Sequence, residues 1–289
     1  MSSSTSIDDA ARQAIGGDRE ALERLMRALQ SHIHGLALRM LWNREDAEDA
    51  TQEILTRIAT QLPRFEFRSR VETWAYRVAV NYILDAKKSA IERLHLSFER
   101  FAANLADGLE PAAPEDTERS ILIEEVKVAC TLAMLQCLDR PHRLAYVLGE
   151  LMEISGPEAA DAMDISPALF RKRLQHARRS VLDFTRTYCG LASDSAACRC
   201  PRRVSRAALA DRGGGRALQF ASQPISFEEA RALVRRVDQA RWAAEVHRSS
   251  RPSGSSVDLA QGLMDAFDRS RESGFSPDRG SHGPPGAAR

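Results

Sequence analysis

One short basic segment carries the residues best suited to contact a polyanion. The segment "SPALFRKRLQHARRSV", residues 166–181, has no acidic residue and five cations, Arg171, Lys172, Arg173, Arg178 and Arg179. The whole chain of 289 residues has a formal net charge of only +1, so this charge is local. Guanidinium and ammonium groups bind phosphates, and arginine also reads guanine edges in DNA. The segment indicates either a nucleic-acid contact or a solvated basic helix face.

Signals on either side of the cations indicate how they are presented. Ser166 can cap a helix and Pro167 fits its first position. The apolar residues that follow are spaced to share one helix face, at Phe170, Leu174, Ala177 and Val181. The preceding "GPEAADAMDI" indicates another short helix, with Asp164 in the turn between the two. Two short helices joined by a tight turn are the helix-turn-helix motif, whose second helix enters the major groove.

The rest of the chain must position this motif, and its patterns are helical. We expect a flexible N-terminus over residues 1–17 and a helical domain over 18–93, with Ser69 and Glu72 as a capping signature. Residues 94–118 have two prolines and little periodicity, which indicates a linker. A second helical domain follows over 119–185, and then a partly disordered extension over 186–289. The fold class predicted is all-α: two small helical domains joined by a linker, plus a partly helical extension.

The extension contains one strong helix signal. Ser226 and Glu229 can form a capping box, and we expect a helix from Ser226 to about His247. Its apolar stripe consists of Leu233, Val237, Ala240 and Ala244, and a second stripe offers Leu259, Leu263 and Phe267. A lone amphipathic helix is marginal in water, so these stripes need a surface to pack on. We therefore expect the tail to regulate the domains; the alternative is a loosely ordered appendage.

The five cysteines fall into two groups. Cys130 and Cys137 lie one heptad apart and are expected as small buried apolar residues. Cys189, Cys198 and Cys200 lie near several arginines, which would lower a thiol pKa and favour metal binding or oxidation. Three ligands do not complete the usual zinc set, and an inert segment is the alternative. No other cofactor is expected.

Two long segments together resemble a known family. "REDAEDATQEILTRIATQLPRFEFRSRVETWAYRVAVNYILDAKK" resembles region 2 of bacterial sigma factors of the extracytoplasmic-function (ECF) subfamily. "LDRPHRLAYVLGELMEISGPEAADAMDISPALFRKRLQHARRSV" resembles their region 4, and the resemblance covers roughly residues 15–185. It implies a sigma factor that binds core RNA polymerase and promoter DNA, with an anti-sigma factor as a further candidate partner.

The resemblance also implies roles for individual residues. The polymerase-binding positions on the "DAEDATQE" helix are Asp46, Glu48, Asp49, Gln52 and Glu53. The positions facing the minus-ten element are Phe65, Phe67, Arg68, Arg70, Arg77, Asn81, Lys87 and Lys88. The positions facing the minus-thirty-five element are Ser166, Arg171, Lys172, Arg173, Gln175, Arg178 and Arg179. Arg171 and Arg173 are expected to contact bases. The helical spacing of Trp74, Val78 and Tyr82 instead predicts core residues, with a base-stacking surface as the alternative.

Other classes fit the sequence less well. It contains no Gly-rich phosphate loop, no HExxH motif and no nucleophile–base pair, so we do not expect an enzyme. It has no secretory signal and no apolar run near 20 residues, which favours a cytoplasmic protein without a membrane span. A helix-turn-helix regulator that acts without polymerase is the alternative function. It would leave the acidic "DAEDATQE" helix unexplained.

Overall fold

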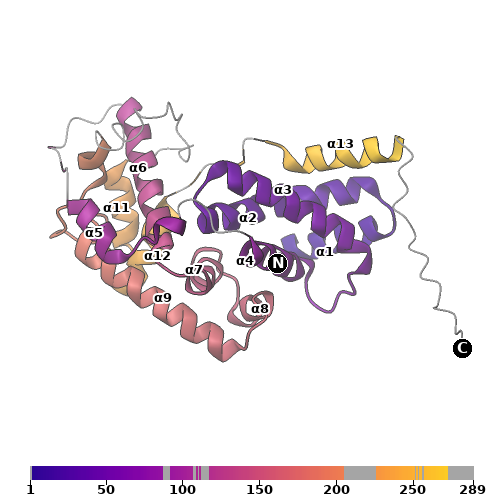
Figure 1. Ribbon diagram of the computed structural model, residues 1–289, viewed down its shortest axis with the longest axis horizontal. Coiled ribbons are helices and arrows are strands. Elements are labelled where there is room, and N and C mark those ends of the chain that lie inside the picture. Colours follow the sequence, from indigo (N-terminus) through magenta and orange to yellow (C-terminus); the bar gives the residue numbers. More distant parts are fainter. Residues whose placement is uncertain are drawn as a thin grey trace, which may run out of the picture.

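The computed structural model describes residues 2–86, 92–106, 109, 111, 117–204, 226–250, 252, 254–255 and 257–272. Over these residues the regular elements are helices, with no β-strand, as predicted for an all-α chain (Figure 1). No helix in this described part is long and apolar enough to cross a membrane.

The N-terminal domain is a bundle of four helices: α1 Ser2–Ile15, α2 Arg19–Leu41, α3 Arg44–Gln61 and α4 Val71–Asp85. Asp18 caps α2 by accepting the backbone N–H of Ala21 at 3.0 Å, and Asn43 caps α3 in the same way at Asp46. The turn between them is made by Trp42, whose φ of 49° is left-handed. Short polar caps and one tight turn thus set α2 and α3 side by side.

Two expectations for this domain are wrong. Residues 1–17 were expected to be flexible, but α1 spans Ser2–Ile15 and buries Ala10 and Ala11. Ser69 does not cap α4, because the N-cap is Arg70 and no side chain of that segment makes the capping bond. Instead Asp8 of α1 accepts the backbone N–H of Val71 at 2.9 Å. The helix is therefore capped by a residue distant in sequence, which a local motif search cannot find.

The C-terminal domain consists of α5 Phe98–Ala106, α6 Thr117–Gln136, α7 Arg140–Tyr146, the π-helical turn η3 Val147–Leu151, α8 Gly156–Ala162 and α9 Pro167–Tyr188. The 3-10 turn η2, Glu92–Leu94, precedes it. The expected linker is therefore partly helical, since α5 lies within 94–118 and buries Phe101 and Leu105. Phe101 stacks on Phe184 of α9, with ring centroids 5.3 Å apart.

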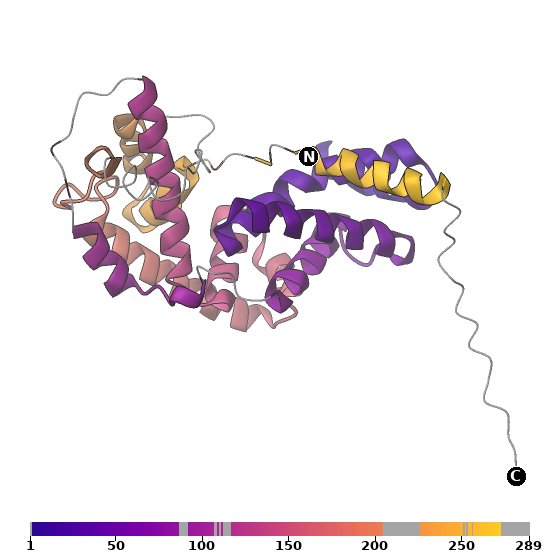
Figure 2. The ribbon, with the colours of Figure 1, turned by 45° about the horizontal axis from the view of Figure 1, so that its top comes forward.

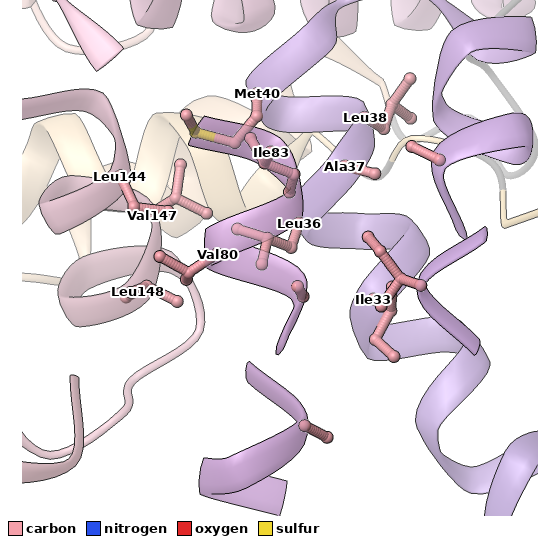
Figure 3. Close-up of a cluster of buried hydrophobic side chains, with 14 of the residues drawn as sticks. Ile33, Leu36, Ala37, Leu38, Met40, Val80, Ile83, Leu144, Val147 and Leu148 are labelled. Atoms are coloured by element: carbon pink, nitrogen blue, oxygen red, sulfur yellow. The ribbon is translucent and has the colours of Figure 1, made fainter. Parts of the chain in front are cut away.

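The two domains share one continuous core. Leu36, Met40, Val80 and Ile83 of the first domain meet Leu144, Val147 and Leu148 of the second (Figure 3). Arg143 is 3% exposed and donates to the carbonyls of Met40, Leu135 and Leu138 at 2.6–3.0 Å. Glu92 accepts from Arg143 at 3.1 Å and balances its charge. The two domains, which the sequence separates by a linker, thus lie closed against each other.

The extension packs on both domains through η4 Cys200–Arg203, α11 Phe227–Arg235, η5 Gln239–Arg241, α12 Trp242–Ser249 and α13 Leu259–Glu272. The capping box of Ser226 and Glu229 is confirmed. The single helix expected to reach His247 is wrong, because α11 ends at Arg235 and α12 starts at Trp242. The predicted stripe is only partly confirmed: Ala244 is buried, but Leu233 and Val237 are half-buried and Ala240 is exposed. Helix α11 buries Phe227, Ala230 and Val234 instead.

Helix α13 packs away from α11 and α12. It runs beside α2 and α3 of the N-terminal domain in both views (Figures 1 and 2). Leu259 and Leu263 are buried there, as their spacing predicts. Ion pairs join Arg19 to Asp268 and Arg27 to Asp258. Helix α13 therefore packs on the outer surface of the N-terminal domain.

Candidate nucleic-acid interface

The helix-turn-helix forms as predicted. Ser166 accepts the backbone N–H of Leu169 at 3.2 Å and so caps α9. Asp164 makes the turn with a φ of 51°, a left-handed conformation that aspartate tolerates. The apolar face of α9 is buried as expected, at Phe170, Leu174, Ala177 and Val181. Gly149 in η3 allows this packing, since a Cβ there would lie 2.9 Å from Leu174.

The opposite face of α9 is basic and open. Arg171, Lys172, Gln175 and Arg179 are exposed, and Arg173 is half-buried. Among the residues that the structure describes, none of these four cations has a carboxylate within ion-pair distance. Arg178 differs, because it pairs with Glu150 of η3. Four of the five predicted cations are thus available to a phosphate backbone or a base edge, and Arg178 would first have to leave its partner.

The loop before α4 presents aromatic rings. The ring of Phe65 stacks on Trp74 at 4.8 Å and lies 4.7 Å from that of Phe67. Phe67 has a φ of 54°, and the Arg12 guanidinium lies 4.0 Å above its ring. Arg68 is exposed and pairs with Glu66 at 2.5 Å. A cluster of half-buried rings beside a cation is a surface on which an unpaired base can stack.

The three residues of α4 that were expected in the core are only partly buried. Trp74, Val78 and Tyr82 are half-buried and pack against the core without entering it. The Arg57 guanidinium lies 4.9 Å above the Tyr82 ring. The face of α4 that these residues line is therefore partly accessible.

Two predicted DNA contacts on this face already have acidic partners. Arg77 pairs with Asp161 of α8 and also donates to its carbonyl at 3.2 Å. Arg70 pairs with Glu72 and lies 3.4 Å from Glu158 of α8. Helix α8 thus sets two carboxylates where the resemblance implies DNA. Asn81 is exposed, and Lys87 and Lys88 lie outside the described residues.

Helix α3 carries an acidic face on the outside of the bundle. Asp46, Asp49, Gln52 and Glu53 are exposed, whereas Glu48 is half-buried and pairs with Arg44 at 3.2 Å. A groove of about 460 Å³ runs along this face, lined by Asp49, Gln52, Glu53, Thr56, Arg57 and Tyr82. Because Ile54 and Ile58 point into the core, these polar residues share the outer side. Helix α13 packs on α3 but leaves them exposed.

The cysteines behave differently from the prediction. Cys189, Cys198 and Cys200 line one small apolar cavity together with Cys130, which was expected to be only a core residue. Burial raises the pKa of the Cys198 thiol to about 11, and it outweighs the opposite influence of Arg203 and Arg202. The expected lowering of the thiol pKa is therefore wrong. Within the described residues no three such side chains are grouped as a metal requires, so metal binding remains an unsupported prediction.

Comparisons with known proteins agree with this geometry. Residues 25–91, which include α3 and α4, match the family model described as Sigma-70 region 2. The chain is 26% identical to the ECF RNA polymerase sigma factor SigW of Bacillus subtilis over 182 residues, 59% of this chain and 91% of that protein. It is 28% identical to the RNA polymerase sigma-H factor of Pseudomonas aeruginosa over 170 residues, 57% of this chain and 86% of that protein.

A third relative, the ECF RNA polymerase sigma factor SigE of Mycolicibacterium smegmatis, is 24% identical over 184 residues, 62% of this chain and 68% of that protein. A region 2 bundle followed by a helix-turn-helix with a free basic helix defines a sigma factor of the sigma-70 type. ECF sigma factors are among the relatives to which the chain is similar, and this supports a place in that subfamily.

Proposed function

We propose that this chain binds core RNA polymerase through α3 and directs it to promoter DNA, so that transcription starts at selected sites. The observation that carries the proposal is the exposed acidic face of α3 within the segment that matches region 2. Carboxylates on one exposed face suit a basic docking surface. The protein is then a non-catalytic subunit that acts in the cytoplasm.

DNA recognition is divided between the two domains in this proposal. The rings of Phe65 and Phe67 supply a stacking surface for a base of the opened minus-ten element. The cations of α9 supply phosphate and base contacts at the minus-thirty-five element. A plain helix-turn-helix regulator would need only the second surface.

The contact between the two domains limits how far apart their DNA-binding surfaces can lie. The two promoter elements are separated by roughly 25 base pairs, or about 85 Å at about 3.4 Å per base pair. Helices α4 and α8, by contrast, are in direct contact through Arg77 and Asp161. We infer that this contact holds the two DNA-binding surfaces closer together than the two promoter elements lie. We therefore propose that the domains separate when polymerase binds, and that this frees Arg70 and Arg77 for DNA.

Charge reversal on α3 tests the docking surface. We expect Asp49→Arg to weaken binding to core polymerase at least tenfold, because attraction toward a basic surface becomes repulsion. Asp183→Arg is the matched control, since Asp183 is exposed on α9, far along the chain from α3. Binding is measured by fluorescence anisotropy of the labelled protein with core polymerase, and folding by circular dichroism melts. Equal binding by wild type and Asp49→Arg would refute the docking surface.

A further inference from the structure

A polar cavity lies where helix α2 meets the chain just after α12. It has a volume of about 260 Å³ and is lined by Ser31, His34, Gly35, Leu38, Arg39, Arg248, Ser250, Pro252 and Gly254. A second cavity of about 310 Å³ shares Ser31, Gly35 and Arg39 with it and continues toward Tyr76 and Leu151. The Arg39 side chain therefore lines both cavities.

Arg39 is a half-buried cation that lines both cavities and has no ion pair among the described residues. Its Nη1 donates to the carbonyl of Gly35 at 2.9 Å, and no carboxylate in the described part of the chain lies within ion-pair distance. Burial lowers its pKa, which shows that the surroundings disfavour the charge. Arginine nevertheless stays protonated in proteins, so an unpaired positive charge faces the two cavities and is available to an anion that enters them.

Two more nitrogen atoms of the cavity residues are buried without a hydrogen-bond partner in the described chain. One is Nε2 of His34, whose residue is 3% exposed, and the other is Nε of Arg248. Burial lowers the pKa of His34, so its ring is neutral and can donate one N–H. The other nitrogens of Arg248 are engaged: Nη2 donates to the Glu150 carbonyl at 2.6 Å and pairs with Glu153 at 2.8 Å, and Nη1 lies 3.9 Å from a carboxylate oxygen of Glu245.

We propose that this cavity binds a small phosphate-bearing anion. The Arg39 guanidinium supplies the charge, and His34 and Arg248 supply further N–H donors. An oxyanion with several acceptor oxygens suits donors that come from different elements, and the guanidinium fork matches phosphate geometry. The volume lies near the lower end for small-molecule sites, which fits a phosphate with a small attached group.

The bound anion would also connect parts of the fold. Arg39 and His34 belong to the N-terminal domain, whereas Arg248 belongs to the extension and is bonded to Glu150 of the C-terminal domain. A ligand held by all three adds a link between the two domains in their closed arrangement. It therefore favours the closed chain over the open one.

Thermal unfolding of the full-length protein tests the site. The probes are inorganic phosphate, pyrophosphate and 5′-AMP, each compared with sodium chloride at equal ionic strength. We expect at least one of them to raise the Tm by about 5 °C or more at a hundredfold excess over Kd. Arg39→Met should abolish that rise, and without the anion it should melt no lower than wild type because it removes an unpaired, half-buried charge.

Two further variants keep the test decisive. Arg24→Gln, on the same helix but exposed, should respond as wild type does. His34→Asn should weaken binding at least tenfold, as measured by isothermal titration calorimetry, and this holds even if Arg39→Met misfolds. Equal Tm rises in wild type and Arg39→Met, or no rise with any probe, would overturn the proposal.

Discussion

The contact between Asp161 and Arg77 predicts that a single neutral substitution loosens the closed chain. Asp161→Asn removes the charge of the pair but leaves the backbone carbonyl that Arg77 also contacts. Both side chains are more than 40% exposed, so the pair is screened by solvent and contributes about 0.2–1 kcal/mol. That range corresponds to a change of roughly 1.4- to 5-fold in the ratio of closed to open molecules, with RT of about 0.6 kcal/mol.

The assay is the affinity of the labelled protein for core polymerase at fixed ionic strength. When the open form is a minority, the apparent Kd varies inversely with its population, so we expect the Kd of Asp161→Asn to fall by the same 1.4- to 5-fold. Asp183→Asn makes the same charge change away from the domain contact and should leave the Kd unchanged. A double-mutant cycle with Arg77→Gln then isolates the pair. The reasoning is refuted if Asp161→Asn strengthens binding equally on the Arg77→Gln background.

Three further predictions follow from the described contacts. Arg171→Ala should reduce the free energy of promoter binding by about 1–3 kcal/mol, and only on promoters that keep the base pairs it contacts. Lys172→Ala should weaken binding to all promoter variants evenly and reduce its salt dependence. If both variants lose affinity in the same way across promoter variants, Arg171 is not a base contact distinct from Lys172. Burial lowers the pKa of His247 to about 3, so the unfolded chain binds the extra proton between pH 6.5 and 3 and stability falls as the pH drops through that window. From pH 7 to pH 5 we expect the free energy of unfolding to fall by about 2 kcal/mol more in wild type than in His247→Phe, and denaturant titrations that give the same loss in both proteins would contradict this. Truncation after Ser250 removes α13 and exposes the apolar surface of α2 and α3, so the Tm should fall and binding of a hydrophobic dye should rise; an unchanged Tm would show that α13 is not docked in solution.

Local signals in the sequence were enough to define the helix-turn-helix. Ser166 and Pro167 fix the start of α9, and the spacing of its apolar residues gives the buried face directly. The capping box at Ser226 was equally readable, because both partners lie within four residues. Such features depend on neighbours in the chain and not on the tertiary fold.

Features that depend on distant partners could not be read in this way. Asp8 caps α4 across 63 residues, so the signal at Ser69 was misleading. Cys130 lies near the other thiols because α6 packs on η4, which begins at Cys200. Arg39 has no acidic neighbour because the elements packed around it present no carboxylate to it among the described residues. The pairing of Arg77 with Asp161 likewise requires the two domains to close. The sequence does hold one signal for Arg39: it is a charged residue between the apolar residues Leu38 and Met40 of α2.

Run-off transcription with purified core polymerase tests the central claim most directly. The protein is added to core polymerase on a pool of genomic promoter fragments, and the transcripts are sequenced from their 5′ ends. We expect discrete start sites that depend on the protein, share two elements upstream, and disappear with Asp49→Arg but not with Asp183→Arg. Tight sequence-specific binding to DNA by the protein alone, with no affinity for core polymerase and no discrete start sites, would contradict the account.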